Sequence, residues 1–86
     1  MTNHPIIHYP LATEKSIRLM ESENKLIFIV GINATKPEIS KAIEDEFKVK
    51  IEKVRTLIDR KGRKKAYITF SQETPAIDVA TKLGLM

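Results

Sequence analysis

The sequence contains no cysteine, and only three of its 86 residues are glycine. Without cysteine, disulfide bonds, thiol catalysis and cysteine-ligated metal sites are excluded. The three glycines lie far apart, which excludes a glycine-rich phosphate-binding loop. The longest apolar run, Leu26–Ile32, is too short to cross a bilayer, so we expect no membrane insertion. The first ten residues lack the build of a secretion signal, and we therefore expect a cytoplasmic protein.

Length and residue types also argue against an enzyme. A chain of 86 residues suits one domain with a small core and little room for a deep, water-excluding cleft. His4 and His8 have helical spacing, but Pro5 between them disfavours a helix and no third ligand is near. A small acylphosphatase-like enzyme would need an arginine in an N-terminal phosphate loop, whereas the first arginine is Arg18. We expect one domain over residues 1–86 with no catalytic residue, metal, cofactor or small-molecule substrate.

The first half of the chain predicts a short edge strand, a helix, a central strand and a second helix. Within residues 1–12 we expect at most the edge strand, and Thr13 is a candidate N-cap for a helix that buries Ile17 and Met20. Residues 26–30 are apolar on both faces, which is typical of a central strand. Thr35 and Glu38 then form a capping-box pattern. The apolar face of the second helix is formed by Ile39, Ile43 and Phe47.

The second half predicts two strands joined by a basic turn, followed by a third helix. Residues 49–59 look extended, with a slip of phase after Ile51 that indicates a bulge or a late strand start. Residues 66–70 alternate apolar and polar as in a half-buried strand. Thr74 and Pro75 suit the N-cap and first position of the last helix. That helix is expected to bury Ile77, Ala80 and Leu83 and to stop at Gly84.

This order of elements predicts an α/β (α+β) fold. A strand–helix–strand unit is expected to be joined by a right-handed crossover. The last strand then lies between the two parallel strands, which gives a split β-α-β, ferredoxin-like sheet of three to four strands with helices packed against it.

Positive charge is concentrated in one segment. The whole chain carries +4, yet residues 48–65 contain nine Lys and Arg against Glu52 and Asp59, a net charge of +7. Two like charges about 4 Å apart repel by roughly 1 kcal/mol even in water. An anionic partner, most often a phosphate backbone, therefore best explains the cluster. The structural alternative is a soluble, lysine-rich turn.

Residues 63–70 partly match the RNP1 strand of RNA-recognition motifs, whose exposed rings stack on bases. We expect the ring of Tyr67 to be exposed, and Phe28 and Phe70 to lie in the core. A free RNA-recognition-motif-like module that binds single-stranded RNA is the alternative function. That module requires Tyr67 and an aromatic ring from residues 26–30 to face solvent on one sheet surface.

Several further segments share the register of one known family. They are Tyr9–Lys15, Asn24–Leu26, Phe28–Val30, Ala34–Ile39, Val49–Val54, Thr56–Leu57, Gly62, Lys64–Tyr67, Ala76–Ala80 and Leu83–Gly84. On these residues the chain resembles the universal large-subunit ribosomal protein twenty-three family in its short archaeal form. The resemblance implies a structural constituent of the large subunit that binds rRNA near the exit of the polypeptide tunnel. It also implies ribosomal protein twenty-nine as a neighbour, and a surface where signal recognition particle and other nascent-chain factors dock.

The resemblance and the charge pattern together nominate the functional residues. In the family, the loop between the last two strands meets rRNA, and the acidic residue of the Thr-Glu-Lys motif, here Glu14, belongs to the docking site. Arg55 replaces the family's usual asparagine and offers phosphate contacts instead of amide hydrogen bonds. Recognition is expected to be mainly of RNA shape and backbone. The candidate RNA-binding residues are Lys15, Lys36, Arg55, Arg60, Lys61, Arg63, Lys64, Lys65 and Tyr67. Neutralising Lys61, Arg63 and Lys64 together is predicted to abolish rRNA binding and leave the fold intact.

Overall fold

The computed structural model describes residues 6–82, so the predictions for His4, Leu83 and Gly84 lie outside the described residues. Three helices and four strands follow one another in the predicted order. They are β1 (Ile7–Pro10), α1 (Glu14–Glu23), β2 (Lys25–Val30), α2 (Lys36–Phe47), β3 (Ile51–Ile58), β4 (Lys64–Phe70) and α3 (Ala76–Lys82). None of the helices within residues 6–82 has the length and apolar character that crossing a lipid bilayer requires.

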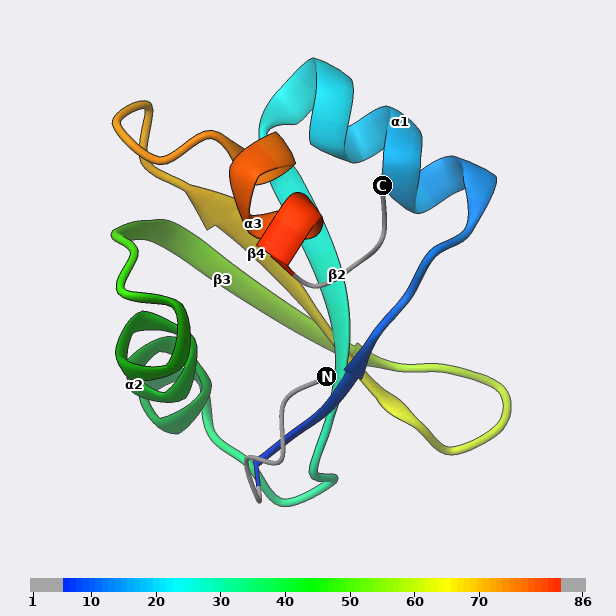
Figure 1. The fold of residues 1–86 in the computed structure, drawn as a ribbon. Helices are drawn as coiled ribbons and strands as arrows, with labels where there is room; N and C mark the ends of the chain where they lie inside the picture. The colour runs from blue at the N-terminus through cyan, green and yellow to red at the C-terminus, as the bar shows by residue number, and fades with distance from the viewer. Residues whose placement is uncertain (1–5, 83–86) are drawn as a thin grey trace.

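The four strands form one sheet in the order β1-β2-β4-β3 (Figure 1). Every neighbouring pair is antiparallel. Because β4 lies between β2 and β3 and is antiparallel to both, β2 and β3 are parallel to each other. The predicted split β-α-β arrangement is therefore confirmed. The phase slip in the third strand is also confirmed, because the register with β4 shifts between Ile51 and Lys53.

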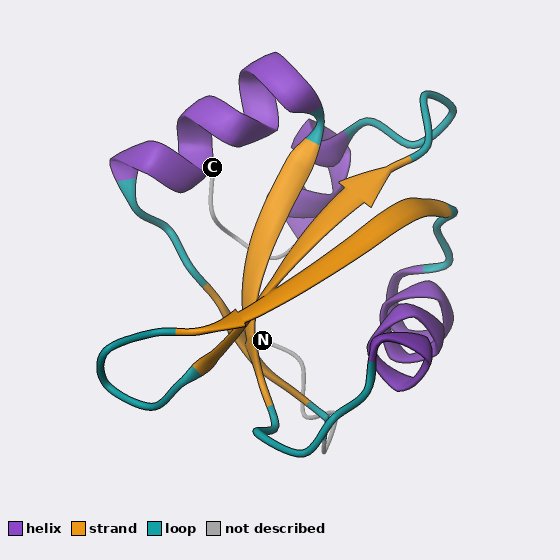
Figure 2. Ribbon diagram, turned by 180° about the vertical axis from the view of Figure 1, so that it is seen from behind, coloured by secondary structure: helices purple, strands orange, loops and turns teal. Residues whose placement is uncertain are grey.

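The helices cover one face of the sheet, the face in front in Figure 1. The core on this side is built on Phe28, Ile68 and Phe70 of the strands, with Ile39 of α2 and Val79 of α3 against them. The other face, turned toward the viewer in Figure 2, has no helix crossing it, and we call it the open face. In β4 the helix side takes residues 64, 66, 68 and 70, so Lys65, Tyr67 and Thr69 lie on the open face.

Both long helices are N-capped by the predicted threonines, Thr13 and Thr35. The Thr13 hydroxyl accepts a hydrogen bond from the Ser16 amide at 3.2 Å, and the Ser16 hydroxyl accepts one from the Thr13 amide at 2.9 Å. In the capping box of α2, the Thr35 hydroxyl accepts from the Glu38 amide at 3.3 Å, and the Glu38 carboxylate accepts from the Thr35 amide at 3.0 Å. These caps satisfy amides that have no partner within the helix.

Two apolar side chains expected in the core are instead on the surface. Ile17 is 38% exposed, and the buried residues of α1 are Ser16 and Met20. Ile77 is 45% exposed, because the short helix α3 buries Ala76, Val79 and Ala80 at i, i+3 and i+4 spacing. The predictions for Met20 and Ala80 are confirmed, since both side chains are buried, and those for Ile17 and Ile77 are wrong.

The start of α3 also differs from the prediction. The helix begins at Ala76, and its first amide donates to Oδ1 of Asn24 at 2.6 Å. The Thr74 hydroxyl accepts from the Lys50 amide at 3.4 Å, so we find no N-cap contact for it. A side chain 52 residues away in the sequence therefore does the capping that the sequence pattern assigned to Thr74.

Candidate nucleic-acid interface

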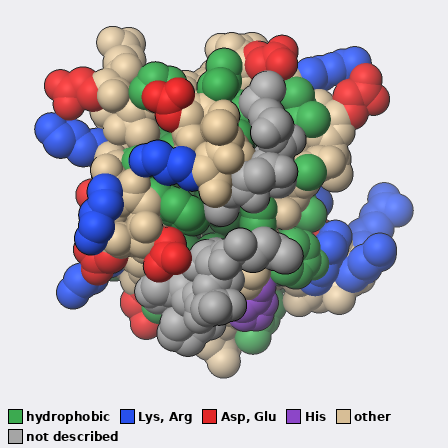
Figure 3. Space-filling model, viewed as in Figure 1, with side chains coloured by type: hydrophobic (Ala, Val, Ile, Leu, Met, Phe, Trp, Pro, Cys, Tyr) green, Lys and Arg blue, Asp and Glu red, His purple; other side chains and the backbone are tan. Residues whose placement is uncertain are grey.

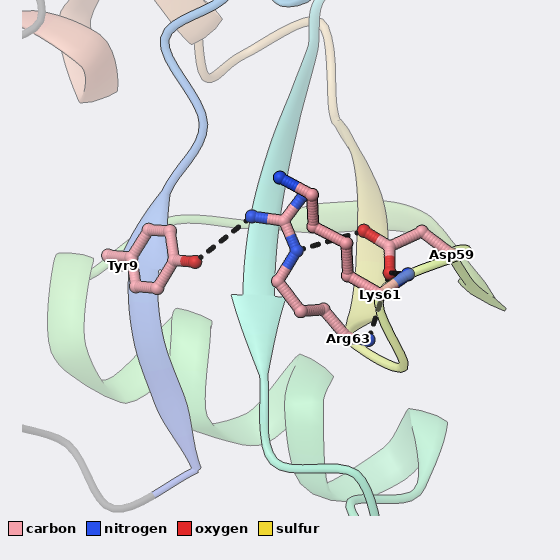
Figure 4. A network of polar contacts seen from close by, with 4 residues as sticks. All are labelled: Tyr9, Asp59, Lys61 and Arg63. Atoms are coloured by element: carbon pink, nitrogen blue, oxygen red, sulfur yellow. Dashed lines mark hydrogen bonds and ion pairs between the residues drawn. The ribbon is translucent and has the colours of Figure 1, made fainter.

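The β3–β4 hairpin ends in a turn organised by the carboxylate of Asp59 (Figure 4). Oδ1 of Asp59 accepts from the backbone amides of Lys61 and Arg63, each at 2.9 Å, and Oδ2 accepts from Nε of Arg63 at 2.9 Å. Gly62 has a φ of 80°, in the region where a side chain would strain the backbone. Asp59 and Gly62 thus fix the shape of the turn that carries Arg60, Lys61 and Arg63.

The turn is also tied to the far edge of the sheet. Nη1 of Arg63 donates to the Tyr9 hydroxyl of β1 at 3.2 Å, so this guanidinium joins the turn to β1 (Figure 4). The Tyr9 hydroxyl and the Asp59 carboxylate raise the pKa of Arg63. In return, the amide and side chain of Arg63, with the Lys61 amide, hold the pKa of Asp59 below its ordinary value. Tyr9 and Asp59 were both absent from the predicted site.

We expect this turn to loosen in acid. Because the pKa of Asp59 is lowered by folding, its contribution is present above the unfolded pKa of about 3.9 and is lost as pH falls through the folded pKa. Below about pH 4, the amide NMR signals of Lys61 and Arg63 are expected to shift together, and Asp59→Asn should abolish this response. The Thr35 amide is the internal control, since Glu38, whose pKa is also lowered, still titrates in the variant. Unchanged titration of the Lys61 amide in Asp59→Asn would contradict the assignment.

Lys64 lies apart from the rest of the basic cluster. It belongs to β4, not to the turn, and its Nζ donates to the Ala34 carbonyl at 2.6 Å. This bond fixes the side chain on the helix side of the sheet, next to the start of α2. Lys36, the first residue of α2, lies near the same carbonyl and is exposed. These two candidates are therefore grouped with each other and not with Lys65.

Three other candidates meet on the open face. Arg55 of β3 lies directly opposite Tyr67 of β4, and Lys15 of α1 joins them in lining a cavity of about 260 Å³. Tyr67 is half-buried, less exposed than predicted. Two pairs closer to the turn, Lys65 lies opposite Leu57 on the same face. The open face and the turn thus form one continuous cationic surface.

Most of the basic candidates on this surface lack an ion pair within residues 6–82, as do other exposed lysines such as Lys41, Lys48 and Lys82. Ion pairs hold Arg18 to Glu14, Lys25 to Glu23, Lys50 to Glu73 and Arg63 to Asp59. By contrast, no ion pair or side-chain hydrogen bond within the described residues engages five of the candidates, Lys15, Arg55, Arg60, Lys61 and Lys65. Basic side chains project over the hairpin at the right edge of Figure 3. Such a surface suits a polyanion, which neutralises several charges at once.

Comparison with family models identifies the family of the chain. The family model described as Ribosomal protein L23 matches residues 5–79. The chain belongs to the ribosomal protein L23 family. The match covers six of the seven elements and reaches into α3, so it includes the hairpin and the open face. L23 proteins are structural proteins of the large ribosomal subunit and not an enzyme family. Within residues 6–82, no group of three His, Asp or Glu side chains is placed to hold a metal.

The aromatic residues of this L23 chain do not form the platform of an RNA-recognition motif. Phe28 is fully buried on the helix side, with its ring centroid 6.1 Å from that of Phe47, and Phe70 is also in the core, as predicted. The strand of residues 25–30 therefore presents no aromatic ring on the open face. Its Ile27 and Ile29 lie there instead, beside Tyr67 and Lys65 in the neighbouring strand.

Glu14, the candidate docking residue of this L23 chain, lies in the first turn of α1. Its carboxylate accepts from Nη2 of Arg18 at 3.1 Å, but both side chains are more than three-quarters exposed. An exposed pair of this kind contributes little to stability, so Glu14 is available to a partner at small cost. Ile17, three positions further along the same helix, is also exposed.

Proposed function

We propose that residues 1–86 act as one rRNA-binding domain that holds this L23 protein on the large ribosomal subunit, in the cytoplasm, near the exit of the polypeptide tunnel. The observation that carries the proposal is the cationic surface of the hairpin and open face, where Arg55, Arg60, Lys61 and Lys65 have no partner within the described residues. Cations that have no partner within the protein can neutralise RNA phosphates, and the release of counterions from the RNA then favours binding.

The fixed shape of the turn supports recognition of RNA by its backbone. Asp59 and Tyr9 hold Nε and Nη1 of Arg63, which leaves Nη2 without a partner in the described residues. A guanidinium held in this way loses little entropy when it contacts a phosphate oxygen. Lys36 and Lys64 are proposed to contact phosphates from the other side of the sheet, where the Ala34 carbonyl orients Lys64.

The same protein is proposed to take part in docking nascent-chain factors. Glu14 and Ile17 on α1 offer an exposed carboxylate next to an exposed apolar side chain, a combination that suits a protein partner. Signal recognition particle and other nascent-chain factors are the proposed partners, with ribosomal protein twenty-nine as a neighbour. Because the turn between β3 and β4 spans only residues 59–63, we propose that it contacts rRNA at the surface and does not line the tunnel.

The proposal is tested by following a tagged copy of the chain in extracts of its own cells. We expect the protein to sediment with large subunits and to remain there after a high-salt wash, since many simultaneous contacts resist salt better than one. Sedimentation of the protein with the free pool at low salt would overturn the proposed function.

A further inference from the structure

The open face contains a groove that the rRNA-binding proposal does not by itself explain. It lies between the first turn of α1 and the strands β3 and β4, and it is lined by Lys15, Lys25, Arg55, Thr56, Leu57 and Tyr67. Its volume of about 260 Å³ lies below the roughly 300–1,000 Å³ of typical pockets for drug-sized ligands. The groove therefore suits one small planar group better than a folded segment of chain.

The chemistry of the lining is both apolar and cationic. Leu57 is 44% exposed and Tyr67 half-buried, so the groove presents apolar surface to solvent. Three of the six lining residues are basic and none is acidic. Lys25 is paired with Glu23 at 3.0 Å, whereas Lys15 and Arg55 have no ion-pair partner in the described residues. A ligand that matches this lining has a flat apolar face and a negative charge nearby.

We propose, on the basis of the rRNA binding proposed above, that this groove holds one nucleotide unstacked from its RNA helix. The base stacks against the ring of Tyr67, and Arg55 and Lys15 contact the phosphates that flank it. Tyr67 lies directly opposite Arg55 in the strand register, so both side chains leave the sheet on the open face from neighbouring positions. No hydrogen bond within the described residues engages the Tyr67 hydroxyl, which leaves it to contact the sugar or base.

The groove is continuous with the basic turn. Lys65 precedes Tyr67 by two residues and lies on the same face, so the two residues are about 7 Å apart along the strand at roughly 3.3 Å per residue. The RNA backbone that leaves the groove therefore meets Lys65 next and then the turn. Any base can stack on an aromatic ring. The groove is therefore expected to add affinity for an unpaired nucleotide of the RNA, with little preference for which base it carries.

The first test is a titration with protein-free transcripts that tile the large-subunit rRNA. With the tightest-binding transcript, Tyr67→Leu is expected to lose about tenfold in affinity with an unchanged salt dependence, because stacking involves no counterions. Tyr67→Phe keeps the ring and is expected to stay within about twofold of the wild type. Arg55→Gln is expected to lower the slope of log affinity against log salt by about one. Equal affinities of Tyr67→Leu and the wild type would overturn the inference.

The second test needs no variant and uses intact large subunits that contain the tagged chain. Short-wavelength ultraviolet light cross-links a base to the side chain on which it stacks. We expect the tryptic peptide of residues 66–82 to carry one nucleotide, linked at Tyr67. If the protein sediments with large subunits but its cross-links are confined to the turn, the nucleotide-binding role of the groove is overturned and the proposed function is not. A protein that fails to sediment with them would overturn both.

Discussion

Replacing Asn24 by alanine is expected to lower the free energy of unfolding by about 3 kcal/mol, since four hydrogen bonds and a favourable backbone geometry are lost. Nδ2 of Asn24 donates to the carbonyls of Phe70, Ser71 and Thr74 at 3.0–3.2 Å, and Oδ1 accepts from the Ala76 amide. One side chain thus joins the end of α1 to the loop between β4 and α3. In a domain of this size the loss corresponds to a fall of about 15 °C in Tm, measurable by thermal unfolding.

Asn24→Gly separates the two contributions. Asn24 has a φ of 56°, a left-handed conformation that glycine adopts freely and alanine does not. The glycine variant therefore loses only the hydrogen bonds, and we expect it to be about 1 kcal/mol more stable than the alanine variant. A loss below about 1 kcal/mol in Asn24→Ala would show that the four backbone groups do not depend on this side chain.

Local sequence signals predicted most of the fold. The capping threonines, Thr13 and Thr35, accept hydrogen bonds from residues three positions away. The starts of these helices can therefore be predicted from a short stretch of sequence. Alternation in β4 is equally local and placed Ala66, Ile68 and Phe70 in the core as expected. Burial on the helices was harder to predict, because which stripe of α1 or α3 faces the sheet depends on how each short helix is docked.

The contacts that shape the candidate interface join residues far apart in the sequence. Arg63 and Tyr9 are separated by 54 positions, and Lys64 and Ala34 by 30, so no local sequence pattern predicts either hydrogen bond. Composition identified the basic cluster but could not show which of its members are already engaged. Asp59 had a local signal, since an aspartate before a basic residue and a glycine is typical of a side chain that bonds to its own turn.

These partners change the design of the charge experiment. In the triple neutralisation of Lys61, Arg63 and Lys64 predicted from sequence, two of the three side chains hold the protein together as well as offering charge. Loss of binding in that variant would follow equally from a distorted hairpin. The better set is Arg60, Lys61 and Lys65, whose side chains make no ion pair or hydrogen bond within the described residues.

The combined variant Arg60→Gln, Lys61→Gln and Lys65→Gln is expected to bind rRNA about a hundredfold more weakly at moderate salt. Each phosphate contact contributes about one unit to the slope of log affinity against log salt, so the slope should fall by about three. Filter binding over a range of salt concentrations measures both quantities. The free energy of unfolding is expected to change by no more than about 0.5 kcal/mol, as is usual for unpaired surface side chains.

A matched variant keeps the net charge equal and moves the substitutions to the helix side. Lys41→Gln, Lys48→Gln and Lys82→Gln remove three exposed lysines of α2, its C-terminal cap position and α3. Because net charge alone steers both variants to the same extent, any difference between them reports the position of the cations. We expect the matched variant to keep its affinity within about threefold and its salt slope within about half a unit of the wild type. An equal loss of rRNA affinity in the two variants would mean that binding depends on the net charge of the protein and not on the cations of the hairpin and open face.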